Sequence, residues 1–167
     1  MQQRIVLREA AAADEREFLG LARASRTLHR PWIAAPATTA QFHAYLERMA
    51  EPHNRALLVC RRDGADLVGV INVTHIVLGV FRSAYLGYYV FAGREGQGFM
   101  RAGLRAAVRH AFKTLQLHRL EANIQPGNTA SIALAKSCGF SLEGYSKRYL
   151  KINGRWRDHE RWAIRSG

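Results

Sequence analysis

The sequence predicts a mixed α/β domain of the α+β kind, in which helices flank a central, mixed but mostly antiparallel sheet of seven strands. Short runs of apolar, β-branched and aromatic residues, each typical of a strand, recur along the chain. Longer segments with apolar residues at helical spacing lie between some of them. Short connections at 62–64 and 153–154 join neighbouring strands, and turns this short permit only antiparallel pairing.

The first half of the chain is expected to begin the sheet and to cover it with two helices. The expected elements are a strand near Ile5 and Leu7, helices at 14–25 and 39–49, and strands at 56–60, 67–76 and 84–90. Thr38 or Thr39 is expected to cap the second helix, because its hydroxyl accepts a hydrogen bond from a backbone N–H. That amphipathic helix and the loop around Trp32 either line a substrate entrance or pack on the core, and the sequence leaves both open.

The second half is expected to complete the sheet. Its expected elements are a helix at 98–114, a strand at 119–124, a short helix at 129–138, and strands at 145–152 and 156–164. Gly139 ends the short helix, and Asn153-Gly154 is a strong signal for a tight hairpin turn. No repeat, low-complexity tract or linker divides the chain, so residues 1–167 are expected to form a single domain.

The composition is strongly basic. Lys and Arg number 25 against 13 Asp and Glu, which gives a formal charge of +12. This balance favours polyanionic partners, namely nucleic acid, ribosomes or a phosphorylated cofactor, and does not choose among them. No signal peptide and no apolar run of membrane-spanning length is visible, so we expect a soluble, cytoplasmic protein with no membrane partner.

Cysteine and histidine usage predicts no metal site. Cys60 lies in an apolar strand and Cys138 at the end of a helix, and neither belongs to a CxxC pattern. We therefore expect two reduced, buried thiols. The histidines show no HExxH pattern and no pairing with cysteine, so no metal is expected.

A glycine-rich turn, Gly93–Met100, separates the aromatic strand 84–90 from the helix that starts near Gly98. Backbone N–H groups at a helix N-terminus lack partners, the helix dipole adds positive charge there, and glycines let a ligand approach. This combination binds phosphate, although a plain turn has the same glycines. The turn does not match GxxxxGK[ST], and Arg101 replaces the third glycine of GxGxxG, which disfavours a nucleotide P-loop or a Rossmann site.

Five short motifs occur in an order that resembles a known family. They are Glu95-Gly-Gln-Gly-Phe-Met100, Asn128-Thr-Ala-Ser131, Cys138-Gly-Phe140, Leu142-Glu-Gly144 and Gly154-Arg-Trp-Arg-Asp-His159. Together they resemble the GNAT superfamily of acyl-CoA N-acyltransferases, and within it the Rim-type subgroup that acetylates the N-terminal alanine or serine of ribosomal proteins. The resemblance covers residues 84–164 well, and the first eighty residues only through the order of their elements.

The resemblance implies acetyl-CoA as co-substrate and assigns its binding residues. The implied residues are Tyr89, Val90, Phe91, Glu95, Gly96, Gln97, Gly98, Phe99, Met100, Asn128 and Ser131. Amides of the glycine turn would bind the pyrophosphate, Asn128 the pantetheine arm, and a backbone N–H between Tyr89 and Phe91 the carbonyl oxygen. Glu95 and Met100 depart from the usual superfamily motif, and binding by backbone amides tolerates both changes.

The resemblance also implies that Ser131 donates a hydrogen bond to the leaving thiolate. Asn128 and Ser131 have a simpler interpretation as the cap and first turn of a helix, and the two interpretations are compatible. An N-terminal amine has a pKa near 8, so a mild base, or one acting through water, is enough. Glu121 is the candidate base, since alternation puts polar Asn123 and Gln125 on its face, although it is equally suited to pair with an arginine.

Other candidate bases stay open. In one branch of the Rim-type subgroup a glutamate is the assigned base, and Leu150 occupies that position here, so that mechanism does not transfer. Tyr145, Tyr149, Asp158 and His159 are second candidates, and the last two could equally pair with the neighbouring Arg155 or Arg157.

Three functions follow from these observations. The leading one is acetyl transfer to the N-terminal amine of a protein, foremost a ribosomal protein, with ribosome association as an implied partnership. The second is acetylation of a small amine such as an aminoglycoside, a polyamine or an amino acid. The third is a non-catalytic module that binds RNA or the ribosome, which the absence of paired RNP motifs disfavours. Whether the chain is a monomer or a homodimer stays open.

Overall fold

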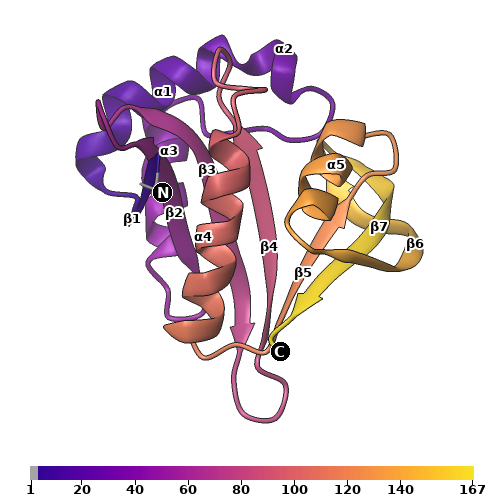
Figure 1. Ribbon diagram of the computed structural model, residues 1–167. Helices are drawn as coiled ribbons and strands as arrows, with labels where there is room; N and C mark the ends of the chain where they lie inside the picture. Colours follow the sequence, from indigo (N-terminus) through magenta and orange to yellow (C-terminus); the bar gives the residue numbers. More distant parts are fainter. Residues whose placement is uncertain (1–3) are drawn as a thin grey trace.

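A single sheet of seven strands runs through the protein (Figure 1). The computed structural model describes residues 4–167, so the first three residues of the expected 1–167 domain lie outside the described residues. The strands are β1 (Ile5–Glu9), β2 (Arg55–Arg61), β3 (Leu67–Val77), β4 (Ser83–Val90), β5 (Arg119–Ile124), β6 (Ser141–Ile152) and β7 (Arg155–Arg165). Their order in the sheet is β1-β2-β3-β4-β5-β7-β6. Only β4 and β5 are parallel neighbours, which confirms the predicted fold class.

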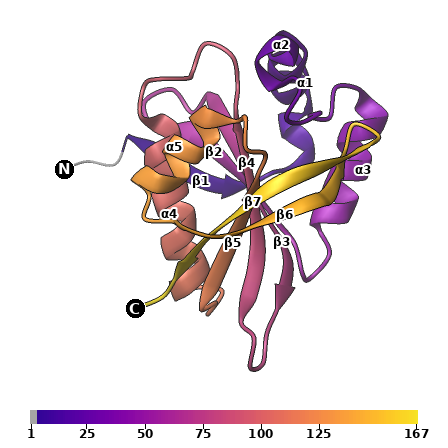
Figure 2. The same cartoon turned by 90° about the vertical axis from the view of Figure 1, so that its right-hand side faces the viewer.

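Helices cover both faces of this sheet (Figures 1 and 2). They are a short 3-10 turn η1 (Ala12–Asp14) and the helices α1 (Glu15–Ala24), α2 (Arg26–His29), α3 (Thr39–Met49), α4 (Phe99–Lys113) and α5 (Thr129–Ser137). One apolar core lies between the sheet and α4 with α5, and a second lies between the sheet and α1 with α3. In the part of the chain that the structure describes, no helix is both long and apolar enough to span a membrane.

Strand β2 shows why the sequences of the central strands are continuously apolar. Leu57 and Val59 belong to the core under α4, whereas Leu58 and Cys60 belong to the core under α1 and α3. A strand that is buried on both faces needs apolar residues at every position. Cys60 and Cys138 are free and buried, as expected.

Two boundaries differ from the prediction, and one alternative that the sequence left open is decided. The last hairpin starts at Ser141 and not at Tyr145, and a register shift between Leu142 and Gly144 disrupts the alternation that would have revealed the earlier start. The first helix ends at Ala24, and the chain turns at the buried Ser25 into the short helix α2. Of the two possible caps of α3, Thr38 is the one that accepts a hydrogen bond, from the N–H of Gln41 at 3.2 Å.

The parallel pair β4 and β5 is joined at one end only. Ser83, Ala84 and Tyr85 pair with the segment Arg119–Glu121, and no further pairs continue the ladder. The two strands separate beyond this point (Figure 1). The separation leaves the second half of β4 without a partner on its β5 side, and this is the position of the candidate site.

An ion pair between the exposed Arg8 and the buried Asp14 gives the stability a pH dependence. The Arg8 guanidinium binds Asp14 with two hydrogen bonds, of 2.6 and 2.9 Å, and the Ala11 N–H donates a third of 2.8 Å. The hydrogen bonds from Arg8, aided by the Ala11 N–H, lower the pKa of Asp14. A lowered pKa contributes stability above the unfolded-state pKa of about 3.9, and that contribution is lost as the pH falls through the folded-state pKa.

We therefore expect Asp14→Asn to lower the free energy of unfolding by about 1–3 kcal/mol at pH 7. The same variant should lose less stability than the parent between pH 7 and pH 3. Urea unfolding at several pH values measures both effects. Asp63→Asn is the matched control, because Asp63 pairs with Arg61 on the exposed surface and should matter little. Equal effects of the two substitutions would contradict the prediction.

Candidate active site

A cavity of about 470 Å³ lies where β4 and β5 separate. Its walls come from four segments: Tyr88–Val90 at the end of β4, the glycine turn before α4, the start of α5, and the stretch from Leu28 to Ile33. Segments far apart in the sequence thus meet at the open end of the sheet. The expected loop around Trp32 is one of these walls, and the Trp32 ring lies against Gly127.

The glycine turn is shaped to hold an anion. Gly93, Gly96 and Gly98 have positive φ angles of 83°, 73° and 79°, which side chains disfavour. Gly98 is the N-cap of the 15-residue helix α4. Within residues 4–167, no protein acceptor engages the backbone N–H groups from Gly96 to Arg101. A Cβ at Gly96 would meet no atom within 4 Å, so space remains above the turn. Free amides, the helix dipole and open space together fit a phosphate group.

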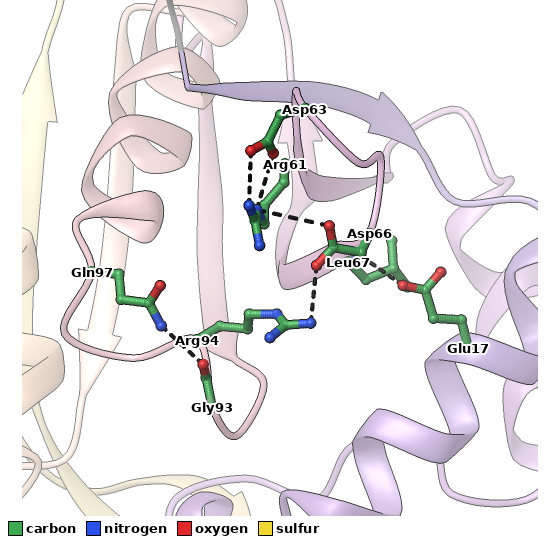
Figure 3. A network of polar contacts seen from close by, with 8 residues as sticks. All are labelled: Glu17, Arg61, Asp63, Asp66, Leu67, Gly93, Arg94 and Gln97. Carbon is green, nitrogen blue, oxygen red and sulfur yellow. Dashed lines mark hydrogen bonds and ion pairs between the residues drawn. The ribbon is translucent and has the colours of Figure 1, made fainter.

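A polar network ties this turn to the connection between β2 and β3 (Figure 3). Arg94 forms an ion pair of 2.9 Å with Asp66, and Asp66 lies 3.8 Å from Arg61. Gln97 donates across the turn to the carbonyl of Gly93 at 2.9 Å. The ion pair between Arg94 and Asp66 thus fixes the turn to the connection between β2 and β3. This role of Arg94 could not be predicted from the sequence, because nothing local links residue 94 to residue 66.

Asn128 and Ser131 start α5 as expected, and both residues line the cavity. The Asn128 side chain caps α5 by accepting the N–H of Ser131 at 3.3 Å. The Ser131 hydroxyl donates to the hydroxyl of Tyr88 at 3.1 Å, and Tyr88 donates to the Ser131 carbonyl at 2.7 Å. Burial raises the pKa of Tyr88 to about 12, so it stays a neutral donor. Tyr88 was missed because its partner is 43 residues away.

The end of β4 presents one backbone N–H to the cavity. Phe91 donates its N–H to Val68 of β3, so in this antiparallel ladder the N–H and C=O of Val90 point the other way, toward β5. The Nε2 of His29 lies 2.8 Å from the Val90 carbonyl. Burial lowers the pKa of His29, and a carbonyl can only accept, so the neutral ring donates through Nε2. His29 therefore fixes the peptide group next to the free N–H of Val90.

The structure brings most of the predicted ligand-binding residues together. The cavity is lined by Tyr89, Val90, Glu95, Gly96, Gly98, Met100, Asn128 and Ser131. Phe91, Gln97 and Phe99 are not among its lining residues. Phe91 is fully buried in the core under α1, and Phe99 lies under the Arg4 guanidinium at 4.4 Å. The Gln97 carbonyl accepts from Arg4 at 3.0 Å. Gln97 and Phe99 can still contribute their backbone N–H groups, whereas the Phe91 N–H is already bound to Val68.

Glu121 lies outside the cavity lining. It pairs in register with Tyr85 and Ala163 and is nearly buried, and its carboxylate binds Arg119 at 3.1 Å. Arg119 also binds Glu143 at 2.8 Å. The pairing with an arginine, considered as the simpler alternative, is therefore present.

The sheet face that carries Glu121 holds several unpartnered polar atoms. Within the described residues, Tyr89 Oη, Asn123 Oδ1 and Arg161 Nε are buried without a hydrogen-bond partner. Asn123 and Arg161 are direct neighbours across β5 and β7, and strand alternation puts Tyr89 on the same face. Buried polar groups in native proteins are almost always paired, so these atoms indicate a place for a polar ligand.

The second candidate residues lie in the β6–β7 hairpin. Asp158 accepts hydrogen bonds from the Tyr145 hydroxyl and the Arg148 N–H, both at 2.8 Å. His159 is buried, with Nδ1 2.9 Å from the Arg157 carbonyl. A hydrogen bond with Tyr85 raises the pKa of Tyr149 to about 12. Asp158 therefore serves the hairpin backbone and does not pair with the side chains of Arg155 or Arg157.

Sequence comparison identifies the class to which this site belongs. Residues 4–141 match the model of the acetyltransferase (GNAT) domain, and the chain therefore belongs to the GNAT acetyltransferase family. This confirms the resemblance inferred from the motifs.

Individual relatives show which acetyltransferases the chain is similar to. The chain is similar to the [ribosomal protein uS5]-alanine N-acetyltransferase of Escherichia coli, with 42% identity over 102 residues that make up 61% of this chain and 53% of that protein. The chain thus spans about half the length of this curated relative. It is also similar to the spermidine N(1)-acetyltransferase of Vibrio cholerae, with 29% identity over 59% of this chain and 57% of that protein. Among solved structures, Mycobacterium smegmatis RimJ in complex with CoA-disulfide matches with a TM-score of 0.88 and 29% identity, over 97% of this chain and 82% of that one.

Proposed function

We propose that this protein transfers the acetyl group of acetyl-CoA to the N-terminal α-amine of a protein, with a ribosomal protein as the leading acceptor. The observation that carries the proposal is the cavity between β4 and β5, which joins the glycine turn, the free N–H of Val90 and the hydroxyl of Ser131. The likeness to a RimJ solved with a CoA derivative supports it. The reaction proposed would take place in the cytoplasm.

The cavity residues suit the parts of the donor in order. The amides from Gly96 to Met100 would bind the pyrophosphate, and Asn128 would contact the pantetheine arm. The Val90 N–H would donate to the thioester carbonyl oxygen, where negative charge develops when an amine attacks. The Ser131 hydroxyl, which donates its proton to Tyr88 in this structure, would turn to donate it to the departing thiolate.

The acceptor would approach from the face that carries Tyr89, Asn123 and Arg161. The walls on this side are the Trp32 loop, α3 and the β6–β7 hairpin. The attacking amine must be neutral, and Glu121 on the same face is the proposed base, acting through water. Tyr149 lies next to Tyr85 at the same level of the sheet, but its pKa is raised to about 12, so the phenol stays protonated and is not proposed as the base.

Acceptor choice tests the proposal. A polyamine or aminoglycoside needs free carboxylates, because charge recognition requires opposite charge. On this face Glu121 and Glu143 are both paired with Arg119, and the net charge of +12 repels polycations. We expect kcat/KM for peptides that begin with Ala or Ser to exceed kcat/KM for spermidine and kanamycin, measured by release of free thiol.

Blocked peptides supply the control. An N-terminally formylated copy of each peptide should not react, because it lacks the free amine. Turnover of spermidine without turnover of any free peptide would favour the small-amine alternative. Spermidine is the small amine to test because the chain is similar to a spermidine acetyltransferase. Binding of acetyl-CoA without turnover of any amine would contradict the catalytic proposal itself.

A further inference from the structure

The outer part of the β6–β7 hairpin carries basic residues and no acidic ones. Residues 147–157 contain no Asp or Glu, and the basic residues in it are Lys147, Arg148, Lys151, Arg155 and Arg157. All of these are exposed. Across residues 4–167, none of them takes part in an ion pair. Beside the site Arg94 and Arg119 are paired with carboxylates, whereas the charge on this segment is available to a partner.

An exposed tryptophan lies within this segment. Trp156 is 54% exposed, and Tyr145 on the neighbouring strand is 51% exposed. Trp156 pairs in register with Lys151, so the indole and the ammonium group lie side by side on one face of the hairpin. A large aromatic ring left half in water beside cations has no role in the core of this chain, and this points to a surface for a ligand.

The hairpin is built to hold these groups outward. β6 is the edge strand of the sheet, and its tip lies well apart from the loop between β4 and α4 (Figure 2). The register shifts between Ser146 and Leu150, and Arg148 has a positive φ of 48°. Asp158 accepts the Arg148 N–H and so stabilises this bulge. The bulge takes Lys147 and Arg148 out of the regular ladder, a few positions along β6 from Lys151 and its partner Trp156.

Strand alternation separates this face from the proposed acceptor groove. Trp156 shares its side of β7 with Asp158, Glu160 and Trp162, and Asp158 is already bound to Tyr145 and to the Arg148 N–H. Arg161 and Ala163 lie on the side of Glu121. A partner on the Trp156 face therefore need not enter the groove.

We propose that the face formed by Lys147, Arg148, Lys151 and Trp156, here called the hairpin patch, binds unpaired RNA. An unpaired base stacks on the indole and the three cations contact phosphates, which is the way in which single strands are bound. The mixture of aromatic surface and unpaired positive charge favours a nucleic acid over a purely acidic protein. This inference goes beyond acetyl transfer and does not depend on it.

The test measures anisotropy of a fluorescein-labelled RNA stem-loop with an unpaired loop, against a fully paired RNA of equal length. The triple variant Lys147→Gln, Arg148→Gln, Lys151→Gln should bind more weakly. Its plot of log affinity against log salt should flatten by about 2, since each phosphate contact on a single strand contributes about 0.7. The matched control Arg16→Gln, Arg109→Gln, Lys113→Gln removes three exposed charges from α1 and α4 and should keep most of the affinity.

Trp156 provides an independent reading. Trp156→Ala should weaken loop binding about tenfold without changing the salt slope, and Trp156→Phe should restore part of the loss. Melting temperatures show that each variant is folded. Equal losses in the two triple variants, tight binding of the paired RNA alone, or no effect of Trp156→Ala would overturn the proposal. A labelled glutamate-rich peptide that binds as tightly, with the same dependence on Trp156, would overturn it in favour of an acidic protein partner.

Discussion

Gly98→Asp is expected to abolish the binding of coenzyme A while the chain still folds. Gly98 is the N-cap of α4, and aspartate is a favoured N-cap residue that tolerates a left-handed backbone better than most. The nearest atom to a Cβ there is the Arg4 guanidinium at 3.8 Å, so the side chain fits. Its carboxylate would occupy the free amides and repel the pyrophosphate. The rise in melting temperature that ligand binding produces should therefore disappear.

Gly98→Asn is the matched control for this prediction. Asparagine has the shape of aspartate and no charge, so its variant should retain weakened but measurable binding. Titration calorimetry with coenzyme A ranks the three proteins. If Gly98→Asp binds like the parent, the phosphate does not lie on the glycine turn. If both variants lose binding equally, shape and not charge accounts for the loss.

Ser131→Ala is expected to lower kcat about 100- to 1000-fold with little change in KM. A donor to the leaving group acts mainly as charge develops in the transition state, and removal of one such donor has costs of this order. The start of α5 should survive, because Asn128 binds the backbone N–H of residue 131, which alanine keeps. Rates are measured with saturating acetyl-CoA and an Ala-initiated peptide, under conditions in which chemistry limits turnover.

Thr129→Ala supplies the comparison, since Thr129 is an exposed hydroxyl residue on the first turn of the same helix and does not line the cavity. Its kcat should stay close to that of the parent. An unchanged kcat in Ser131→Ala would reduce Ser131 to a helix-start residue. A rise in KM alone would mean that Ser131 binds the donor equally in the ground state and the transition state.

Local sequence signals were enough for most of the fold. Hydrophobic periodicity, the Asn-Gly turn and the glycine turn each act over a few neighbouring residues, and the elements they predict are present. The predicted boundaries were wrong where contacts between residues far apart in the sequence determine them. The start of β6 at Ser141 depends on a bulge opposite β7, and the break after α1 depends on Ser25, whose hydroxyl accepts the N–H of Ala92.

The candidate site divides in the same way. The glycine turn and the Asn128 cap are sequence-local, so they could be predicted. The contacts of His29 with Val90 and of Tyr88 with Ser131 join residues 61 and 43 positions apart, and only the folded chain brings them together. Alternation correctly put Glu121 and Asn123 on one face. It could not show that this face lies across the sheet from the glycine turn, because that depends on how β4 and β5 diverge.

The short junction between β4 and β5 has a mechanical consequence. Three residue pairs connect a four-stranded half of the sheet to a three-stranded half, so the two halves meet as a wedge with its apex at Ser83–Tyr85. The glycine turn belongs to one arm of the wedge and Ser131 to the other. A molecule that contacts both arms would bridge the gap between the two halves of the sheet. The angle between the arms would then set the distance between its bound phosphate and its reacting end.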